Sequence, residues 1–337
     1  MERDRLSFYE PNTDGAPVSV ISVPLELGSD ERGLAAAPKY IFEHGLEKMF
    51  SAIGREVSQN TTLICPKPSQ VVSAGVMKHV EAIVRVGRRA KAVAEKAARR
   101  GDTVVALGGD HSAALGPIAG AASAHRSLGL IYIDAHPDCT TDETTISGNV
   151  HGMVVSSAIG RGNKALTDLF SKHIAPEHVL YIAIKDIDKG EIDLIRESGM
   201  HYVTMLDIAA QGLSPVLRLV GALSQRVEKI WVSVDLDSID EQYAPAVAMA
   251  TPGGLTRREI VSIAHHIGRV CDVAGIDIVE MLPAKDREAA TARLAIELLA
   301  RLLGGQYDWY EHYMEHYREI NVTGERETVA VRRGQGR

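Results

Sequence analysis

The sequence predicts an α/β fold: one domain of three layers, αβα, with helices on both sides of a central, mainly parallel sheet. Short apolar runs rich in valine and isoleucine alternate along the chain with longer segments of helical periodicity, as in parallel βαβ units. No proline- or serine-rich linker divides the 337 residues, so one sheet can extend through the whole domain.

The expected strands and helices follow one another in order. Apolar runs with strand character occupy residues 18–25, 103–107, 130–133, 179–184, 202–205, 230–234 and 276–279. Helical spacing of apolar residues occupies residues 80–99, 215–224, 257–270 and 286–303. The basic stretch 85–100 interleaves arginine and lysine with alanine and valine, which predicts a helix with one solvated face.

Polar clusters follow three of these strands, at the point where each apolar run stops. The imidazole and carboxylate residues there are His111, Asp134, His136, Asp138, Asp235 and Asp237. Residues i and i+2 at a strand end point to the same side, and ligands bind beyond the carboxyl ends of parallel strands. A single aspartate in such a place is usually a helix cap or a turn residue. Capping does not call for histidine alternating with aspartate, so the repeated pattern favours a metal site.

Four aspartates in one pocket would repel one another and could not all stay ionised without cations between them. Carboxylates mixed with imidazoles suit Mn²⁺, and ligand type alone also allows Zn²⁺, Fe²⁺, Co²⁺ and Ni²⁺. Two ions about 3.5 to 4 Å apart would bridge a water and ionise it near neutral pH. The implied chemistry is hydroxide attack on an electrophilic carbon or phosphorus.

Residues 108–112 (GGDHS), 134–138 (DAHPD) and 233–240 (SVDLDSID) resemble the three metal-binding signatures of the arginase, or ureohydrolase, family. The resemblance extends from about residue 18 to residue 304 and implies an arginase-like fold with two Mn²⁺ ions per subunit. It also implies that His111, Asp134, Asp138 and Asp237 are shared between the ions, with His136 and Asp235 completing the shell.

Within the family the chain is most similar to arginase. Residues 147–152 (SGNVHG) resemble the segment in which Ser147 and Asn149 would hold the substrate α-carboxylate and His151 would carry protons. Residues 185–191 resemble the segment whose aspartates, here Asp186 and Asp188, would face the α-amino group. Both could instead simply face solvent at a helix start.

Glu280 matches the family glutamate that pairs with the guanidinium group. A carboxylate can bind a planar guanidinium in bidentate geometry, which suits Glu280. A histidine titrates near neutrality and can deliver a proton to the departing amine, which suits His151. With Asp138 as a metal ligand, these are the expected catalytic residues.

Two segments depart from the arginase pattern. Thr140 stands where an asparagine helps to hold the carboxylate. The loop after Asp240 is altered at residues 246–250, and Val247 stands where a pocket-lining threonine is expected. Replacing hydroxyl and glycine by apolar side chains removes hydrogen-bonding capacity and backbone freedom. The changes allow a modified guanidine, another side-chain length or weakened activity.

The expected function is hydrolysis of L-arginine, or of a close analogue such as N-hydroxyarginine, by Mn-bound hydroxide, giving urea (or hydroxyurea) and ornithine. An agmatinase or guanidino-acid hydrolase is the nearest alternative, and a non-catalytic, metal-binding family member with a regulatory role is another. The resemblance also implies a homo-oligomer, a trimer or a hexamer. Residues 1–305 would form the catalytic domain, and residues 306–337 a C-terminal helix and tail that could contact another subunit.

The remaining features concern partners and location. A net charge of −7 argues against a broad nucleic-acid or anionic-membrane surface. Without a run of about 18 apolar residues or a secretory leader, the expected location is cytoplasmic.

The three cysteines, Cys65, Cys139 and Cys271, form no metal pattern and favour a reducing compartment. Cys139 is interpreted as a small packed residue, with sensitivity to oxidation as the alternative. The H-x-x-E-H pattern at residues 312–316 matches a zinc-peptidase helix, and we interpret it as a chance match.

Overall fold

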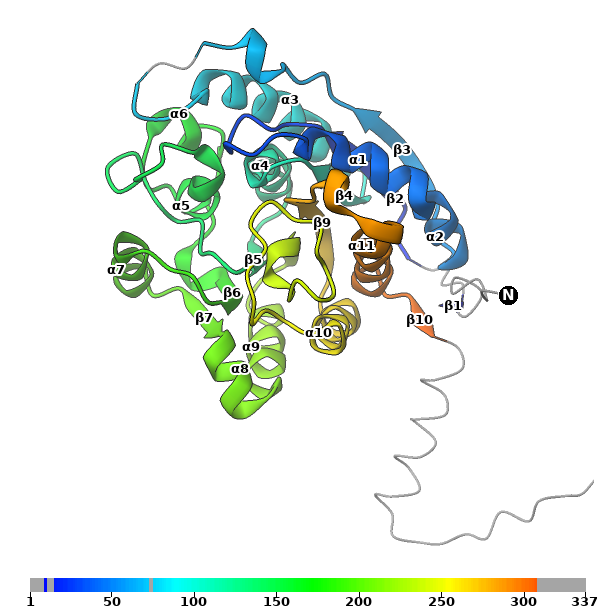
Figure 1. Cartoon of the computed structure of the whole chain (residues 1–337). Helices are drawn as coiled ribbons and strands as arrows, with labels where there is room; N and C mark the ends of the chain where they lie inside the picture. Colours follow the sequence, from blue (N-terminus) through cyan, green and yellow to red (C-terminus); the bar gives the residue numbers. More distant parts are fainter. Residues whose placement is uncertain (1–8, 11–14, 73–74, 308–337) are drawn as a thin grey trace, which may run out of the picture.

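A computed structural model describes residues 9–10, 15–72 and 75–307 of the chain. At its centre lies an eight-stranded parallel sheet in the order β3-β2-β4-β9-β8-β5-β6-β7 (Figure 1). Its strands are β2 (Val18–Val23), β3 (Val57–Thr62), β4 (Thr103–Gly108), β5 (Leu128–Ile133), β6 (Val179–Ile184), β7 (His201–Thr204), β8 (Lys229–Asp235) and β9 (Val273–Val279). A separate antiparallel pair joins β1 (Tyr9–Glu10) to β10 (Gln306–Tyr307).

Helices cover both faces of the sheet, as two separate hydrophobic clusters show. One cluster joins the sheet to α1 (Ala37–Ile41), α2 (Glu47–Ala52), α8 (Met205–Gln211), α9 (Ser214–Ser224), α10 (Arg257–Val270) and α11 (Ala290–Leu302). The other joins it to α3 (Val80–Arg99), α4 (Leu115–Ala124), α5 (Val154–Ala158), α6 (Lys164–Thr167) and α7 (Lys189–Ser198). The three-layer αβα fold with a parallel sheet is therefore confirmed.

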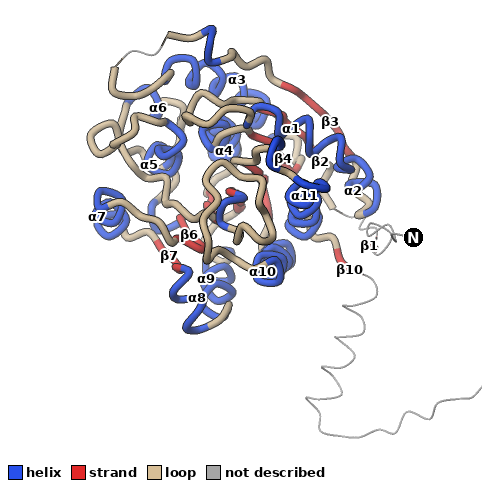
Figure 2. The backbone as a smooth tube through the Cα atoms, viewed as in Figure 1, coloured by secondary structure: helices blue, strands red, loops and turns tan. Residues whose placement is uncertain are grey.

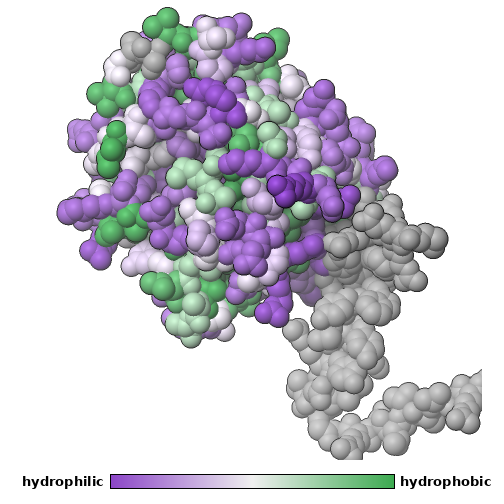
Figure 3. Space-filling view, in the orientation of Figure 1, coloured by the Kyte–Doolittle hydropathy of each residue, from purple (hydrophilic) through white to green (hydrophobic). Residues whose placement is uncertain are grey.

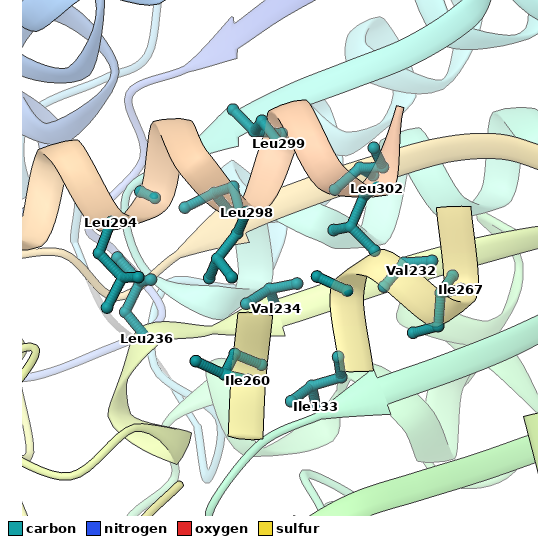
Figure 4. Packing of buried hydrophobic residues seen from close by; sticks show 14 of the residues in the cluster. Ile133, Val232, Val234, Leu236, Ile260, Ile267, Leu294, Leu298, Leu299 and Leu302 are labelled. Carbon is teal, nitrogen blue, oxygen red and sulfur yellow. The ribbon is translucent and has the colours of Figure 1, made fainter. Parts of the chain in front are cut away.

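The core follows from the two-residue period of the strands. In β4, Val105 and Leu107 belong to one cluster, while Val104 and Ala106 belong to the other. Strands buried on both faces read as continuous apolar runs, which is why the sequence marks them clearly. Figure 4 shows one face from close by, where Leu298 of α11 lies against Val234 of β8.

Several element boundaries differ from those expected. The edge strand β3 was not predicted, because its sequence VSQNTT is polar and mostly exposed. The helices α1 and α2 were also not predicted. Helix α11 begins at Ala290 rather than 286, because Glu288 and Ala289 have positive φ angles. Strand β7 ends at Thr204, whose hydroxyl accepts from the Asp207 amide and caps α8.

Long connections without helix or strand follow β5 and β8, at residues 134–149 and 239–256 (Figure 2). They lie at the carboxyl ends of the strands, where the predicted site residues are.

On the face seen in Figure 3, hydrophobic residues gather over α8, where Leu206 is 82% exposed. Among the described helices, none is by itself long and apolar enough to cross a membrane. Of the predicted C-terminal helix and tail, residues 306–307 form strand β10, and residues 308–337, which include 312–316, lie outside the described residues.

Candidate active site

Short turns position the predicted metal ligands at the ends of β4, β5 and β8. Asp134 Oδ1 accepts from the His136 amide at 2.7 Å, and Asp235 Oδ1 accepts from the Asp237 amide at 2.8 Å. Each aspartate thus caps its own turn with one carboxylate oxygen, as a strand-end aspartate commonly does. The second oxygen of each, Oδ2, lies 3.2 Å from Nδ1 of His111. Capping and ligation are therefore compatible roles of the same carboxylate.

The six predicted ligands come together in two groups that share Asp134. Nδ1 of His111 is 3.2 Å from Asp134 Oδ2, 3.1 Å from Asp138 Oδ2 and 3.2 Å from Asp235 Oδ2. In the second group, Nδ1 of His136 is 3.5 Å from Asp134 Oδ1 and 3.2 Å from Asp237 Oδ2. In each group, three residues offer ligand atoms within 4.8 Å of one another.

This division differs from the one that the family resemblance implied. Asp134 belongs to both groups, whereas Asp235 lies with His111 and Asp237 lies with His136. The grouping locates ligand atoms and not ions, so the expectation that Asp237 is shared between the ions and that Asp235 completes the shell stays a prediction. The Asp235 side chain, at the end of β8, points toward the end of β4, which carries His111.

The electrostatics of the two groups fit divalent cations. Burial first, and then Asp138 and Asp237, raise the pKa of Asp134 to about 6. Burial and the neighbouring Asp237 and Asp134 raise the pKa of Asp235 well above its usual value. Burial alone would lower the pKa of His136, but Asp134 and Asp237 raise it to about 12. Buried carboxylates this close together stay ionised only if positive charge lies beside them, and metal ions would supply that charge.

A buried chain of hydrogen bonds from His111 through Ser233 to Asp277 fixes the orientation of the His111 imidazole. The Ser233 hydroxyl donates to Asp277 Oδ1 at 2.7 Å, and Ser233 Oγ lies 2.8 Å from Nε2 of His111. Because Ser233 donates its single hydroxyl proton to Asp277, its oxygen accepts a hydrogen bond from the N–H at Nε2 of His111. The lone pair of Nδ1 is then left for a metal ion, as in many carboxylate-supported histidine ligands. The sequence interpretation missed both Ser233 and Asp277.

Tyr132, which lies beside the His111 group, is a further residue that the sequence interpretation missed. Its side chain is fully buried, and its ring stacks on the His111 imidazole with centroids 4.7 Å apart and an interplanar angle of 6°. The hydroxyl donates to Asp138 Oδ2 at 2.8 Å and lies 3.1 Å from Nδ1 of His111. Its place two residues before Asp134 on β5 is the signal that could have found it.

A cavity of about 280 Å³ opens beside the metal groups. Glu280, at the end of β9, has a φ of 61° and lines this cavity. Its Oε1 accepts from the His111 amide at 2.8 Å and lies 3.1 Å from Nδ1 of His151. Its Oε2 is buried and has no hydrogen-bond partner among the described residues. Burial alone would lower the pKa of His151, but Glu280 raises it to about 9.

Ser147, Asn149, Thr140 and Asp188 also line the cavity. The Thr140 hydroxyl donates to the Gly152 carbonyl at 2.6 Å, so it is engaged with the backbone. Several other residues of the cavity wall were not predicted, among them Thr145, Ile146, Glu191 and Met249. They lie in loops or at a helix start, where no periodic pattern marks which side chain faces a cavity.

Asp186 and Val247 lie elsewhere than expected. The Asp186 side chain is 67% exposed and lines a neighbouring cavity of about 660 Å³, and its Oδ2 is 3.8 Å from Nε2 of His136. Val247 is fully buried in the hydrophobic core, and it is Met249, two residues later, that lines the cavity. Cys139 is also buried, which raises the pKa of its thiol and disfavours the reactive thiolate.

Comparisons with known proteins agree with this geometry. Residues 16–304 match the model of the arginase family. The arginase of Bacillus caldovelox is 32% identical over 293 residues, which cover 86% of this chain and 98% of that protein. Arginase-2, mitochondrial, of Rattus norvegicus is 30% identical and covers 88% of each chain.

Solved structures show the same relationship. The native structure of the Bacillus caldovelox arginase has a TM-score of 0.83 at 31% identity, covering 86% of this chain and 99% of that chain. The agmatine ureohydrolase of Thermoplasma volcanium shares the fold, with a TM-score of 0.65 at 20% identity over 94% of this chain and 97% of that chain. The chain therefore belongs to the arginase family, whose members are hydrolases that act on guanidino groups.

Proposed function

We propose that this protein hydrolyses L-arginine, or a close analogue such as N-hydroxyarginine, to urea (or hydroxyurea) and ornithine, with two Mn²⁺ ions. The observation that carries the proposal is the unpartnered Oε2 of Glu280 in the cavity. A buried carboxylate oxygen without a donor is costly, and a guanidinium group offers parallel N–H donors to it. The arginases among the relatives favour arginine as the substrate.

Glu280 connects the guanidino position to the metal groups. Its Oε1 is held by the backbone amide of His111, whose side chain belongs to the first metal group. Its own backbone amide donates to the Gly109 carbonyl at 2.8 Å, in the turn that leads to His111. A guanidinium bound at Oε2 is therefore held next to the metal groups by short, buried connections. Such pre-organised positioning is a large part of catalytic power.

The two metal groups would hold a pair of divalent ions, which lower the pKa of a bound water to near neutrality when present. The chain's own residues then complete the chemistry. Glu280 orients the planar guanidino group so that its carbon faces the attacking water. His151 lines the same cavity and can give a proton to the departing amine nitrogen, so that ornithine leaves as a neutral amine and urea remains.

The proposal is tested by urea release from the Mn²⁺-loaded protein with L-arginine, N-hydroxyarginine and guanidino acids of different lengths. Turnover of L-arginine or its close analogue is expected, and Asp138→Ala should abolish it by weakening the binding of one ion, at the His111 group. Glu280→Gln keeps the shape of the side chain but removes its charge. A charged hydrogen bond of about 1.5–3 kcal/mol corresponds to a loss of about 10- to 100-fold in kcat/KM.

Metal content separates a substrate-binding role of Glu280 from a structural one. Glu280→Gln should bind the same number of ions as the wild type, because Glu280 belongs to neither metal group. Glu197→Gln, on the exposed side of α7, is the matched control and should leave both properties unchanged. If no guanidino compound is hydrolysed while two ions are bound, the proposal is wrong and a non-catalytic, regulatory role is favoured instead.

A further inference from the structure

We infer that Lys285, an exposed lysine outside the metal and substrate motifs, is a positioning residue for Glu280. Its ammonium group holds the backbone of residues 246–248 against Glu280, and this keeps the Glu280 carboxylate directed into the cavity. Lys285 is not among the described residues that line the cavity or form the metal groups, so it acts through Glu280. The inference rests on the proposed function and adds to it a residue that controls how the guanidino group is held.

The backbone of Glu280 adopts a conformation that needs support. Its φ of 61° lies in the left-handed region, which residues with a side chain rarely adopt and which the surrounding structure must then maintain. Two hydrogen bonds hold it: the Glu280 amide donates to the Gly109 carbonyl at 2.8 Å, and the Glu280 carbonyl accepts from the Ala248 amide at 3.2 Å. Because the direction of a side chain follows its backbone, these bonds also direct the unpartnered Oε2 into the cavity.

The bond between Ala248 and Glu280 is one end of a short, isolated antiparallel bridge. At the other end, the Leu282 amide donates to the Ala246 carbonyl at 2.8 Å. Paired backbone of this length is at best marginally stable by itself in water. The longer of the two bonds, at 3.2 Å, is the one that holds Glu280. The bridge therefore needs a further hold at Ala248.

Lys285 supplies this hold. Its Nζ donates to the Val247 carbonyl at 3.1 Å and to the Ala248 carbonyl at 3.4 Å. The Val247 carbonyl and the Ala248 amide belong to one peptide unit, which is planar. The ammonium group therefore fixes the plane of the N–H that donates to Glu280. It also polarises that N–H, as in other chains of hydrogen bonds.

Loss of the ammonium group should misdirect the Glu280 carboxylate without removing it. The peptide unit between Val247 and Ala248 is then free to turn, and the Glu280 backbone keeps only its bond to Gly109. A misdirected carboxylate still attracts a guanidinium, but it holds the guanidino carbon off the line of attack, and a shift of about 1 Å can cost about 100-fold in rate. Because the bond to Gly109 remains in Lys285→Met, we expect a smaller fall, roughly tenfold, in kcat/KM for L-arginine.

The experiment measures kcat/KM for L-arginine and bound Mn²⁺ in Lys285→Met, Lys285→Arg and Lys172→Met. Lys172 is the matched control, because it is also exposed and also donates to two consecutive backbone carbonyls, those of His125 and Arg126, before the start of β5. Lys285→Met should fall roughly tenfold. Lys285→Arg keeps a cation with N–H donors, so it and Lys172→Met should stay within about threefold of the wild type. All three should bind as many ions as the wild type. A fall of less than about threefold in Lys285→Met, or the same fall in Lys285→Arg or Lys172→Met, would overturn the inference.

A double variant separates a positioning role from a general loss of folded protein. If Lys285 acts through Glu280, adding Lys285→Met to Glu280→Gln, which has already lost the charge, should lower kcat/KM by less than about threefold more. Independent effects multiply, and a partly folded preparation would lower both backgrounds by the same factor. A further fall of about threefold or more would show that Lys285 acts by another route, and it would overturn the inference.

The wild type separates the inference from the proposed function. If the wild type hydrolyses L-arginine and the Lys285 variants behave otherwise than expected, only the inference is overturned and the proposed function stands. If the wild type hydrolyses no guanidino compound, the proposed function is contradicted and the inference falls with it.

Discussion

Removing the hydroxyl of Tyr132 is expected to weaken one of the two metal groups and leave the other intact. Tyr132→Phe keeps the ring that stacks on His111 and deletes only the donor to Asp138 Oδ2, a contact of 2.8 Å between fully or largely buried groups. Asp138 Oδ2 lies 3.1 Å from His111 Nδ1. The described ion pairs of His136, in the second group, do not include Asp138. The loss should therefore be confined to the His111 group.

The size of the effect follows from the charge of the acceptor. A hydrogen bond to a charged group contributes about 1.5–3 kcal/mol. At about 1.4 kcal/mol for each tenfold, that is a loss of roughly 10- to 100-fold in metal affinity. The same range is typical when residues that support metal ligands are replaced.

The assay is a calorimetric titration with Mn²⁺, together with metal analysis of the dialysed protein. We expect two ions per chain in the wild type, and in Tyr132→Phe one ion with unchanged affinity and one that is held more weakly. Tyr181→Phe is the control, since Tyr181 is also fully buried but its hydroxyl lies by Cys139. Equal weakening of both ions in Tyr132→Phe, no weakening at all, or the same loss in Tyr181→Phe would contradict a specific role of the Tyr132 hydroxyl at the His111 group.

Two further predictions concern stability. Leu298→Ala, in the core between α11 and β8, should lower the free energy of unfolding by about 2–5 kcal/mol in urea titrations, and a loss under 1 kcal/mol would contradict the packing described. Asp102→Asn should cost about 1–2 kcal/mol at pH 7, because Asp102 Oδ2 accepts from Ser19, Ser58 and Arg100, each at 2.7 Å. Burial alone would raise the pKa of Asp102, but these hydrogen bonds lower it overall, so its stabilisation is present above about pH 4 and is lost as the pH falls through the lowered value. The free energies of unfolding of the wild type and of Asp102→Asn, measured from pH 7 down to pH 2, should converge. A constant difference between them would contradict this role of Asp102.

The fold could be predicted where burial leaves a mark in the sequence. The strands β4, β5 and β8 are buried on both faces, so their apolar runs stand out and their polar ends mark the site. The edge strand β3 has no such run, because it forms the border of the sheet and is mostly exposed. Apolar runs also do not predict the order of the strands in the sheet, since this order depends on contacts between distant parts of the chain.

The candidate site divides in the same way. The residue types of the candidate metal groups were predictable from alternating aspartate and histidine at strand ends. Their division into two groups depends on which oxygen of Asp235 is used by its own turn and where the other points, which is a three-dimensional property. The Ser233–Asp277 hydrogen bond needs β8 and β9 to be neighbours. Met249 lies in an irregular loop, where nothing periodic distinguishes it from Val247.

We expect two metal ions and Glu280 to act together in the hydrolysis of the guanidino group. The decisive measurement follows urea release from L-arginine and bound Mn²⁺ in the same samples, as the metal-free protein is titrated with the ion. Urea release should appear with bound metal, reach its full rate only when two ions per chain are present, and fall in Glu280→Gln at the same metal content. Full activity with one ion or none, or two bound ions without urea release, would contradict this expectation.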